Sequence, residues 1–230
     1  MATEITTIGA ARAMRRKRQS HIKEYVEAIL IAVVIAVILR MFVVQAYRVS
    51  SGSMESTLLE GDFLFVNKMA YRFADPQVND VIVFEFPMNP TKDYIKRIVA
   101  GPGQTVEVKD KVLIIDGQIV PDMAGMFHSD PDTLPELFSS RDQFGPMQVP
   151  ADHYFVLGDN RDDSQDSRFW GFLEKSHIKG RALFIYYSWA PDPNSPKIES
   201  PYIFDIFTSA FYNIGHVGDR LRADRLFNPL

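Results

Sequence analysis

Residues 94–120 read YIKRIVAGPGQTVEVKDKVLIIDGQIV, and this stretch predicts the fold class of the chain. It contains three short runs rich in β-branched residues, each bounded by turn signals such as Gly101-Pro102-Gly103. Such spacing is typical of consecutive β-strands. Asp116-Gly117 follows the third run, and an Asp-Gly pair favours a two-residue β-hairpin. The three runs are Tyr94–Ala100, Thr105–Val108 and Val112–Ile115.

Similar runs lie on both sides of this stretch, and no helical pattern of 10–15 residues alternates with them. A parallel α/β sheet is therefore not expected. Residues 121–148 hold several Pro, Gly, Asp and Ser residues and predict an extended insertion or loop. The sequence thus predicts an all-β domain over residues 45–196, with a short β insertion at about 105–148. Its further strands are expected at Phe63–Val66, Val81–Phe86, Tyr154–Leu157 and Arg181–Trp189.

The segment after Pro201 has a different pattern, because apolar residues recur at helical spacing between Ile203 and Ile214. This spacing predicts an amphipathic helix within a C-terminal tail of residues 197–230. Two roles remain open for the helix: packing against the domain, or lying on a membrane surface with its aromatic face.

Residues 25–44 form an apolar segment of about 20 residues, long enough to span a bilayer as a helix. Residues 1–24 before it hold six Lys or Arg against two Glu. The positive-inside rule then predicts a single-pass anchor in the inner (plasma) membrane, with a cytoplasmic N-terminus and an extracytoplasmic domain. Two alternatives remain: a cleaved signal peptide, because Val44-Gln45-Ala46 has the small-residue character of a cleavage site, or a buried soluble helix.

Composition excludes several classes of function. The formal net charge is −4, which argues against a general nucleic-acid binder. The chain has no cysteine, so a disulfide framework, a thiol nucleophile and a thiolate metal site are all excluded. The acidic run at 158–168 does not fit a calcium loop, because Ser164 stands sixth from Asp159, where an EF-hand needs glycine. We expect no cofactor and no metal.

Serine residues interleave with Met54 and Leu58 just after the apolar segment. A serine nucleophile needs a base, and none of the five histidines lies in a supporting motif: His21, His128, His153, His177 and His216. Lys96 is the alternative, because the two-residue period of a strand places it on one face with Tyr94 and Ile98. Desolvation on that face would lower the pKa of the lysine.

The third motif is the polar run GDNRDDSQDSR at 158–168, which lies between two aromatic-rich segments and predicts a turn structured by hydrogen-bonding side chains. In this order behind an N-terminal apolar segment, the motifs resemble bacterial type I signal peptidases, or leader peptidases, over residues 25–190. Two further matches are Ser-x-Ser-Met at 51–54, with Thr57-Leu58 and Gly61-Asp62, and Tyr94-Ile95-Lys96-Arg97. The chain departs from the family pattern at Ser50 and Ser56, where proline is usual.

The resemblance implies a membrane-bound serine endopeptidase that removes signal peptides after small residues, at Ala-x-Ala sites. Its partners would be preproteins and membrane lipid, without nucleic acid or metal. The resemblance assigns Ser53 as nucleophile and Lys96 as general base. It also assigns Ser51 as an oxyanion-hole donor and Ser164 as the residue that orients the lysine. Structural ion pairs are implied for Arg97, Asp159, Asp166 and Arg168. The alternatives are another serine–lysine protease, such as a self-cleaving repressor, or a non-enzymatic anchored β-domain that binds envelope proteins.

Overall fold

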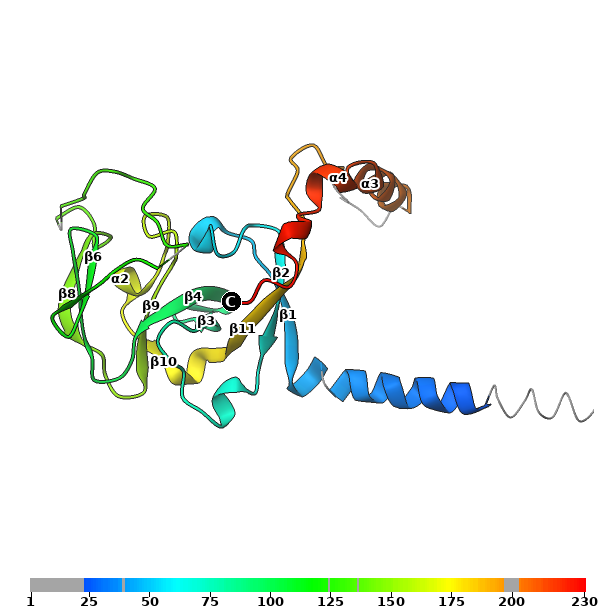
Figure 1. Cartoon of the computed structure of the whole chain (residues 1–230), viewed down its shortest axis with the longest axis horizontal. Coiled ribbons are helices and arrows are strands. Elements are labelled where there is room, and N and C mark those ends of the chain that lie inside the picture. The colour runs from blue at the N-terminus through cyan, green and yellow to red at the C-terminus, as the bar shows by residue number, and fades with distance from the viewer. Residues whose placement is uncertain (1–22, 39, 124, 136, 197–202) are drawn as a thin grey trace, which may run out of the picture. The chain divides into compact units, whose positions relative to one another are not determined.

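The computed structural model describes residues 23–38, 40–123, 125–135, 137–196 and 203–230 (Figure 1). The basic tail expected at residues 1–24 lies almost wholly outside the described residues. The chain divides into two compact units, Met1–Val44 and Gln45–Leu230.

The first unit contains a helix over Lys23–Phe42 with a mean hydropathy of 2.4, and none of this span is buried within the protein. At ~1.5 Å per residue its 20 residues extend about 30 Å, the thickness of a hydrocarbon core. Among the described residues, one helix is thus long and apolar enough to cross a membrane. The helix ends before the predicted limit at residue 44, because Val44 begins a β-strand.

The second unit is built on a seven-stranded sheet with the order β1-β2-β11-β3-β4-β9-β10. The registered pairs within it, from β2–β11 to β9–β10, are antiparallel. Its strands are β1 (Val44–Arg48), β2 (Asp62–Asn67), β3 (Val81–Phe86), β4 (Asn89–Ala100), β9 (His153–Leu157), β10 (Leu173–Glu174) and β11 (Ile178–Ser188).

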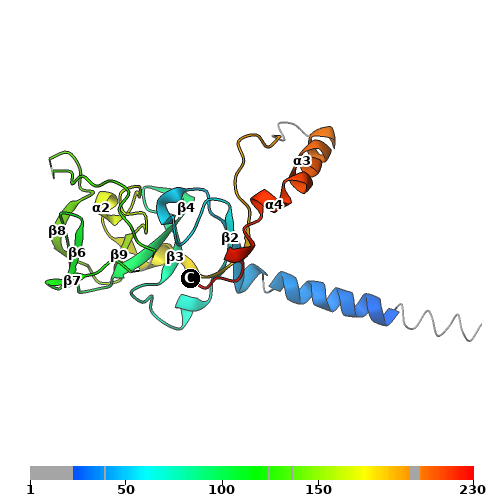
Figure 2. The ribbon, with the colours of Figure 1, turned by 45° about the horizontal axis from the view of Figure 1, so that its top comes forward.

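A four-stranded sheet with the order β7-β6-β5-β8 forms the insertion. Figure 2 shows β6, β7 and β8 together at one end of the domain, away from β2. The hairpin between β6 and β7 turns at Asp116 (φ 52°) and Gly117 (φ 78°), as the Asp-Gly pair predicts. The strands are β5 (Thr105–Lys109), β6 (Val112–Ile115), β7 (Gln118–Val120) and β8 (Gln143–Gln148).

Helices in the second unit are short, which confirms the prediction of a mostly β fold. A helix, α3, occupies the segment whose helical spacing predicts one. The helices are η1 (Gly52–Met54), η2 (Ala70–Arg72), α2 (Ser167–Trp170), η3 (Lys175–His177), α3 (Ile203–Gly215), α4 (Val217–Arg220) and η4 (Ala223–Arg225).

One hydrophobic cluster anchors the loop between β1 and β2 to the main sheet. Met54 and Leu58 from this loop are buried against Leu64, Val66 and other residues of the sheet. Burial of side chains of this size contributes roughly 1.5–3 kcal/mol each. The loop is therefore fixed by its apolar residues.

The last described residues close the edge of β11. Phe227 N donates to Ile185 O at 2.7 Å, and Leu230 N donates to Leu183 O at 3.0 Å. In both views the end marked C lies against the main sheet (Figures 1 and 2). Arg225 makes an ion pair of 2.7 Å with the fully buried Asp62. These long-range contacts were not predicted from the sequence.

Candidate active site

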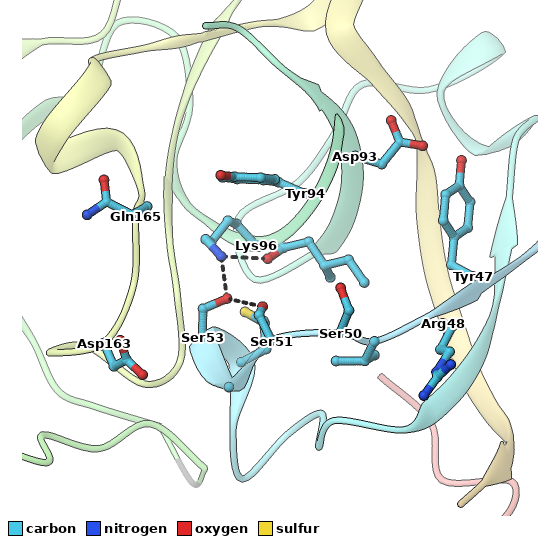
Figure 3. Close-up of a pocket in the computed structure, with 14 residues that line it drawn as sticks. Tyr47, Arg48, Ser50, Ser51, Ser53, Asp93, Tyr94, Lys96, Asp163 and Gln165 are labelled. Atoms are coloured by element: carbon cyan, nitrogen blue, oxygen red, sulfur yellow. Dashed lines mark hydrogen bonds between the residues drawn. The ribbon is translucent and has the colours of Figure 1, made fainter. Parts of the chain in front are cut away.

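Ser53 lies on η1, directly before the buried Met54, and its hydroxyl points toward Lys96 (Figure 3). The backbone of this loop folds on itself, because Leu58 N donates to Met54 O at 2.7 Å. A loop fixed in this way holds the Ser53 hydroxyl in one place.

Lys96 lies on β4 opposite Ile82 of β3 and is only 3% exposed. Its Nζ donates to Ser53 Oγ at 2.6 Å and to Ile95 O at 3.1 Å (Figure 3). The Tyr94 ring covers the amine, with 5.5 Å between Nζ and the ring centroid. The predicted serine and lysine are thus in direct contact.

Burial lowers the pKa of Lys96 from 10.5 to about 8. The carboxylates of Asp166 and Asp159 act in the opposite direction, and the guanidinium of Arg168 reinforces the lowering. The desolvation of the charged form is the larger effect. About a tenth of the amine is then neutral at pH 7, against well under a thousandth for an exposed lysine.

Ser51 lies beside this pair, with 3.3 Å between Ser51 Oγ and Ser53 Oγ. Both hydroxyls line a cavity of about 300 Å³ that also includes Lys96. The structure therefore brings together three of the predicted site residues, Ser51, Ser53 and Lys96, in one cavity.

Ser164 is placed differently from the expectation. Its side chain is buried, but within the described part of the chain its Oγ has no hydrogen-bond partner, Lys96 included. It packs against Gly158, where an added Cβ would clash with Ser164 Oγ and lie 2.5 Å from Ser53 O. Ser164 thus lies behind the nucleophile, and only glycine fits between the two.

The four predicted charged residues form two ion pairs behind the site. Arg97 binds Asp159 through two hydrogen bonds of 2.9 and 2.8 Å, and Arg168 binds Asp166 through two of 2.8 and 2.7 Å. Both carboxylates are almost fully buried, so each needs its partner. Asp166 also accepts a hydrogen bond from Gly158 N at 3.1 Å, which shapes the turn next to Ser53.

The polar run at 158–168 therefore connects β4 to the nucleophile loop. Asn160 N donates to Ser53 O at 3.2 Å. A segment of the insertion joins the same network, because Ser56 Oγ donates to Gly125 O at 2.9 Å and Phe127 forms a bridge with Asn160. Three segments far apart in sequence thus hold the loop that carries Ser53 in position: β4, the polar run at 158–168 and the insertion segment at 125–127.

The backbone accounts for one departure from the family pattern. Ser56 has a φ of +79°, whereas proline is locked near −65°. A proline at this position would require a different loop. Here the bond from Ser56 to Gly125 holds the loop instead.

Other residues also line the cavity, and most of them were not predicted from the sequence. Asp93 and Tyr94 come from β4, where the sequence places Tyr94 on the same face as Lys96. Tyr47 comes from β1, just after the predicted apolar segment. Asp163 and Gln165 line it from the polar run. Asp163 and Gln165 could have been predicted as lining residues, because both lie within the motif at 158–168.

Residues 22–189 match the family model described as "Signal peptidase, peptidase S26". Signal peptidase I of Aquifex aeolicus is 35% identical, over 78% of this chain and 89% of the relative. Signal peptidase I of Pseudomonas aeruginosa is 34% identical, over 76% and 75%. A solved signal peptidase I from Enterococcus faecalis is 30% identical and covers 47% of this chain and 97% of its own, with a TM-score of 0.35.

Proposed function

The chain belongs to the signal peptidase I family of serine peptidases, which cleave signal peptides from preproteins, and we propose that Ser53 is its nucleophile and Lys96 its general base. The observation that carries this proposal is the contact of 2.6 Å between Ser53 Oγ and the amine of a buried lysine. The lowered pKa of Lys96, about 8, supplies the neutral amine that a base requires.

In the proposed mechanism, neutral Lys96 accepts the hydroxyl proton of Ser53 while Oγ attacks the scissile carbonyl carbon. The tetrahedral intermediate collapses to an acyl-enzyme, and the lysine gives its proton to the leaving amine. Water then attacks the ester, Lys96 accepts a proton from that water, and the proton returns to Ser53 Oγ as the signal peptide is released. One lysine serves both half-reactions.

Charge on the substrate oxygen is stabilised by donors from the nucleophile loop. Ser51 is the proposed side-chain donor, together with the backbone N–H of Ser53. Its support is the 3.3 Å separation of the two hydroxyls and their shared cavity. Ser164, Arg97, Asp159, Asp166 and Arg168 are proposed to support the site from behind.

The substrate is proposed to be a preprotein with an Ala-x-Ala cleavage site. A cavity of about 300 Å³ beside the dyad is at the small end of ligand pockets, which favours small side chains next to the scissile bond. The enzyme is proposed to be a single-pass membrane protein with the helix Lys23–Phe42 as its uncleaved anchor. The N-terminus is then cytoplasmic and residues 45–196 form the extracytoplasmic catalytic domain.

The test is cleavage of a purified preprotein that carries an Ala-x-Ala site. Ser53→Ala and Lys96→Ala should each abolish cleavage, and the double variant should be no worse, because residues that act as a unit are not additive. Lys92→Ala changes an exposed lysine of the same strand and should retain full activity. Retention of more than about a tenth of the activity by Lys96→Ala would exclude the lysine as base, since general-base catalysis supplies roughly 10²–10⁴-fold.

A further inference from the structure

Four aromatic side chains form a cluster on the face of the main sheet that carries Lys96. Phe84 of β3 lies opposite Tyr94 of β4 in the sheet register, and Lys96 follows Tyr94 by two positions. Side chains two positions apart on a strand share a face. Phe86 adds a third ring from β3, and Trp170 adds a fourth from α2. The cluster therefore lies on the same face as the amine.

The rings of this aromatic cluster contact one another in well-defined geometries. Phe86 stacks on Tyr94, with 4.3 Å between the ring centroids and 6° between the ring planes. Trp170 lies edge-to-face against Phe86 at 6.2 Å, and it also contacts Phe84 at 5.9 Å. Stacked and edge-to-face arrangements are those that aromatic pairs prefer. The Tyr94 ring is thus held by a stacked ring that is itself supported from α2.

Tyr94 is the ring of the cluster that reaches the cavity beside the dyad. It belongs to the described lining of this cavity, whereas Phe86 and Trp170 do not. The Tyr94 ring lies over Lys96, with 5.5 Å between its centroid and Nζ (Figure 3). Phe86 and Trp170 can therefore influence the lysine only through the ring in front of them.

Contact between the Tyr94 ring and the amine has two opposite effects. The face of an aromatic ring attracts a cation, which favours the charged amine. The same ring excludes water, which disfavours the charged amine. Burial is the largest influence on the pKa of Lys96 and lowers it to about 8. Exclusion of water thus outweighs the attraction, and it depends on the ring staying in place over Nζ.

We propose that Phe86 and Trp170 are positioning residues for the base, because they hold the Tyr94 ring as a cover that keeps water away from the Lys96 amine. The inference rests on the proposed role of Lys96 as general base. Trp170 follows the polar run at 158–168 by two positions. The helix α2 therefore links this run to the cover over the lysine.

Phe86→Leu removes the stacked ring and tests the proposal in the full-length protein. The acid limb of kcat/KM on a soluble peptide should move upward by about one pH unit, because water then reaches the amine. Cleavage at pH 7 should fall about tenfold, since the neutral fraction of the amine falls by that factor. Above the limb, the rate should stay within about twofold of the parent, because the base is then neutral in both proteins.

A moved limb can be assigned to water, because the charged groups that act on Lys96 are unchanged in Phe86→Leu. The hydroxyl of Ser53 and the phenol of Tyr94 are also retained. Trp170 lies close to one of the charged groups in sequence, so Phe86→Leu is the cleaner variant. The charged groups all belong to the polar run, and they are Asp166, Asp159, Arg168 and Asp163.

Two controls separate loss of the cover from general destabilisation. Phe86→Tyr keeps a ring at this position and should retain the parental limb. Phe144→Leu removes a half-buried ring of the insertion that packs on Phe155 at 4.8 Å, and it should leave both limb and rate unchanged. Trp170→Leu should move the limb upward by less than Phe86→Leu, because it acts on Tyr94 through other rings. If Phe86→Leu does not fold, Trp170→Leu decides the question.

A direct titration of the amine does not depend on cleavage. The ¹³Cε resonance of Lys96, assigned by its loss in Lys96→Ala, reports the pKa of this lysine in each variant. If the parental limb coincides with this titration but neither moves in Phe86→Leu or Trp170→Leu, the positioning role is wrong and the base stands. If the parental limb does not follow the titration of Lys96, the base role is wrong and the positioning role with it. An unmoved limb with a lower plateau would indicate a structural role and overturn the proposal.

Discussion

Lys96 combines two properties that rarely occur together, near-complete burial and an ionisable amine. The residue is 3% exposed, and the nearest polar groups to its Nζ are a neutral hydroxyl and a backbone carbonyl. The carboxylates of Asp159 and Asp166 are each engaged by an arginine, so neither neutralises the lysine directly. The site therefore maintains an amine whose charged form is disfavoured.

The pH dependence of cleavage follows from this lysine. Because its pKa is about 8 and the neutral form is active, kcat/KM should rise about tenfold per pH unit below pH 7 and level off above about 8.5. Initial rates on a soluble peptide substrate between pH 5.5 and 9.5 measure this limb. An acid limb near 6.5 that is lost on replacing His153 or His177 would instead identify a histidine base.

The buried charge of Lys96 should also lower the stability of the folded protein at neutral pH. Below pH 8 the amine is protonated in both the folded and the unfolded chain, so the folded state bears the full cost of a buried charge. Above pH 10.5 it is neutral in both states and the cost vanishes. Lys96→Met should therefore raise the free energy of unfolding by about 2–3 kcal/mol at pH 7.

Guanidinium unfolding at several pH values measures that difference. The gain from Lys96→Met should shrink progressively between pH 8 and 10.5, while Lys92→Met, at an exposed position, should change little at any pH. A Lys96→Met protein that is less stable than the parent at pH 7 would show that the amine contributes to folding.

At the scale of elements, the site depends on how closely the turn at 158–168 approaches the nucleophile loop. Gly158→Ala should push Ser53 away from Lys96, because the added Cβ overlaps Ser164 and lies 2.5 Å from Ser53 O. A displacement of about 1 Å costs on the order of 10²-fold in rate. We expect kcat to fall by about that factor, with a smaller change in KM.

The matched control for this loss is Gly101→Ala at the end of β4, where the nearest atoms would be 3.9 Å from the new Cβ. Steady-state kinetics of both variants on one peptide substrate, with circular dichroism to verify folding, complete the comparison. Full activity of Gly158→Ala would mean that the two loops separate without affecting the dyad.

Elements with a strong local pattern could be predicted from the sequence, and those defined by distant partners could not. β3 and β6 were predicted at their observed bounds, because β-branched runs between turn signals encode them locally. β8 lies in residues 121–148, for which the sequence predicts an extended insertion or loop, because Gly145 and Pro146 interrupt the alternation of a strand. Its pairing with β5 supplies the order.

The residues of the candidate site also fall into two groups, those predicted from local motifs and those placed by distant contacts. The motif resemblance placed Ser51, Ser53 and Lys96 together, and the structure brings them into one cavity. Tyr47 was missed because nothing in its local sequence shows that β1 passes beside β4's cavity. The contact of Arg225 with the loop after Ser53 spans 168 positions and leaves no local signal either.

At the scale of the whole molecule, Arg225 joins the end of the domain to its beginning. It pairs with the fully buried Asp62 at 2.7 Å and donates to Thr57 O at 2.9 Å. Arg225→Ala leaves Asp62 with the hydroxyl of Ser188, the backbone N–H of Leu59 and a longer contact of 3.4 Å to Arg222. Because loss of one partner of a buried pair costs about 3–5 kcal/mol, and Arg222 compensates in part, we expect a loss of about 2–3 kcal/mol.

Chemical unfolding of Arg225→Ala and Arg222→Ala checks this assignment. Arg222→Ala should cost less, because its contact with Asp62 is the longer one and its other partners are Ser188 Oγ and Glu60 O. Equal losses for the two variants would show that Asp62 is held by the arginines jointly.

The closure of β11 by residues 227–230 also has a consequence for biosynthesis. These residues follow the rest of the β domain in the sequence, yet they pair with β11 of its main sheet, and Arg225 just before them holds the loop that follows Ser53. In the proposed orientation, the domain is exported with its amino-terminal end first. A nascent chain whose residues 225–230 are still held in the translocation channel therefore lacks the pairing with β11 and the contacts of Arg225. We expect it to acquire proteolytic activity only after these residues have been exported.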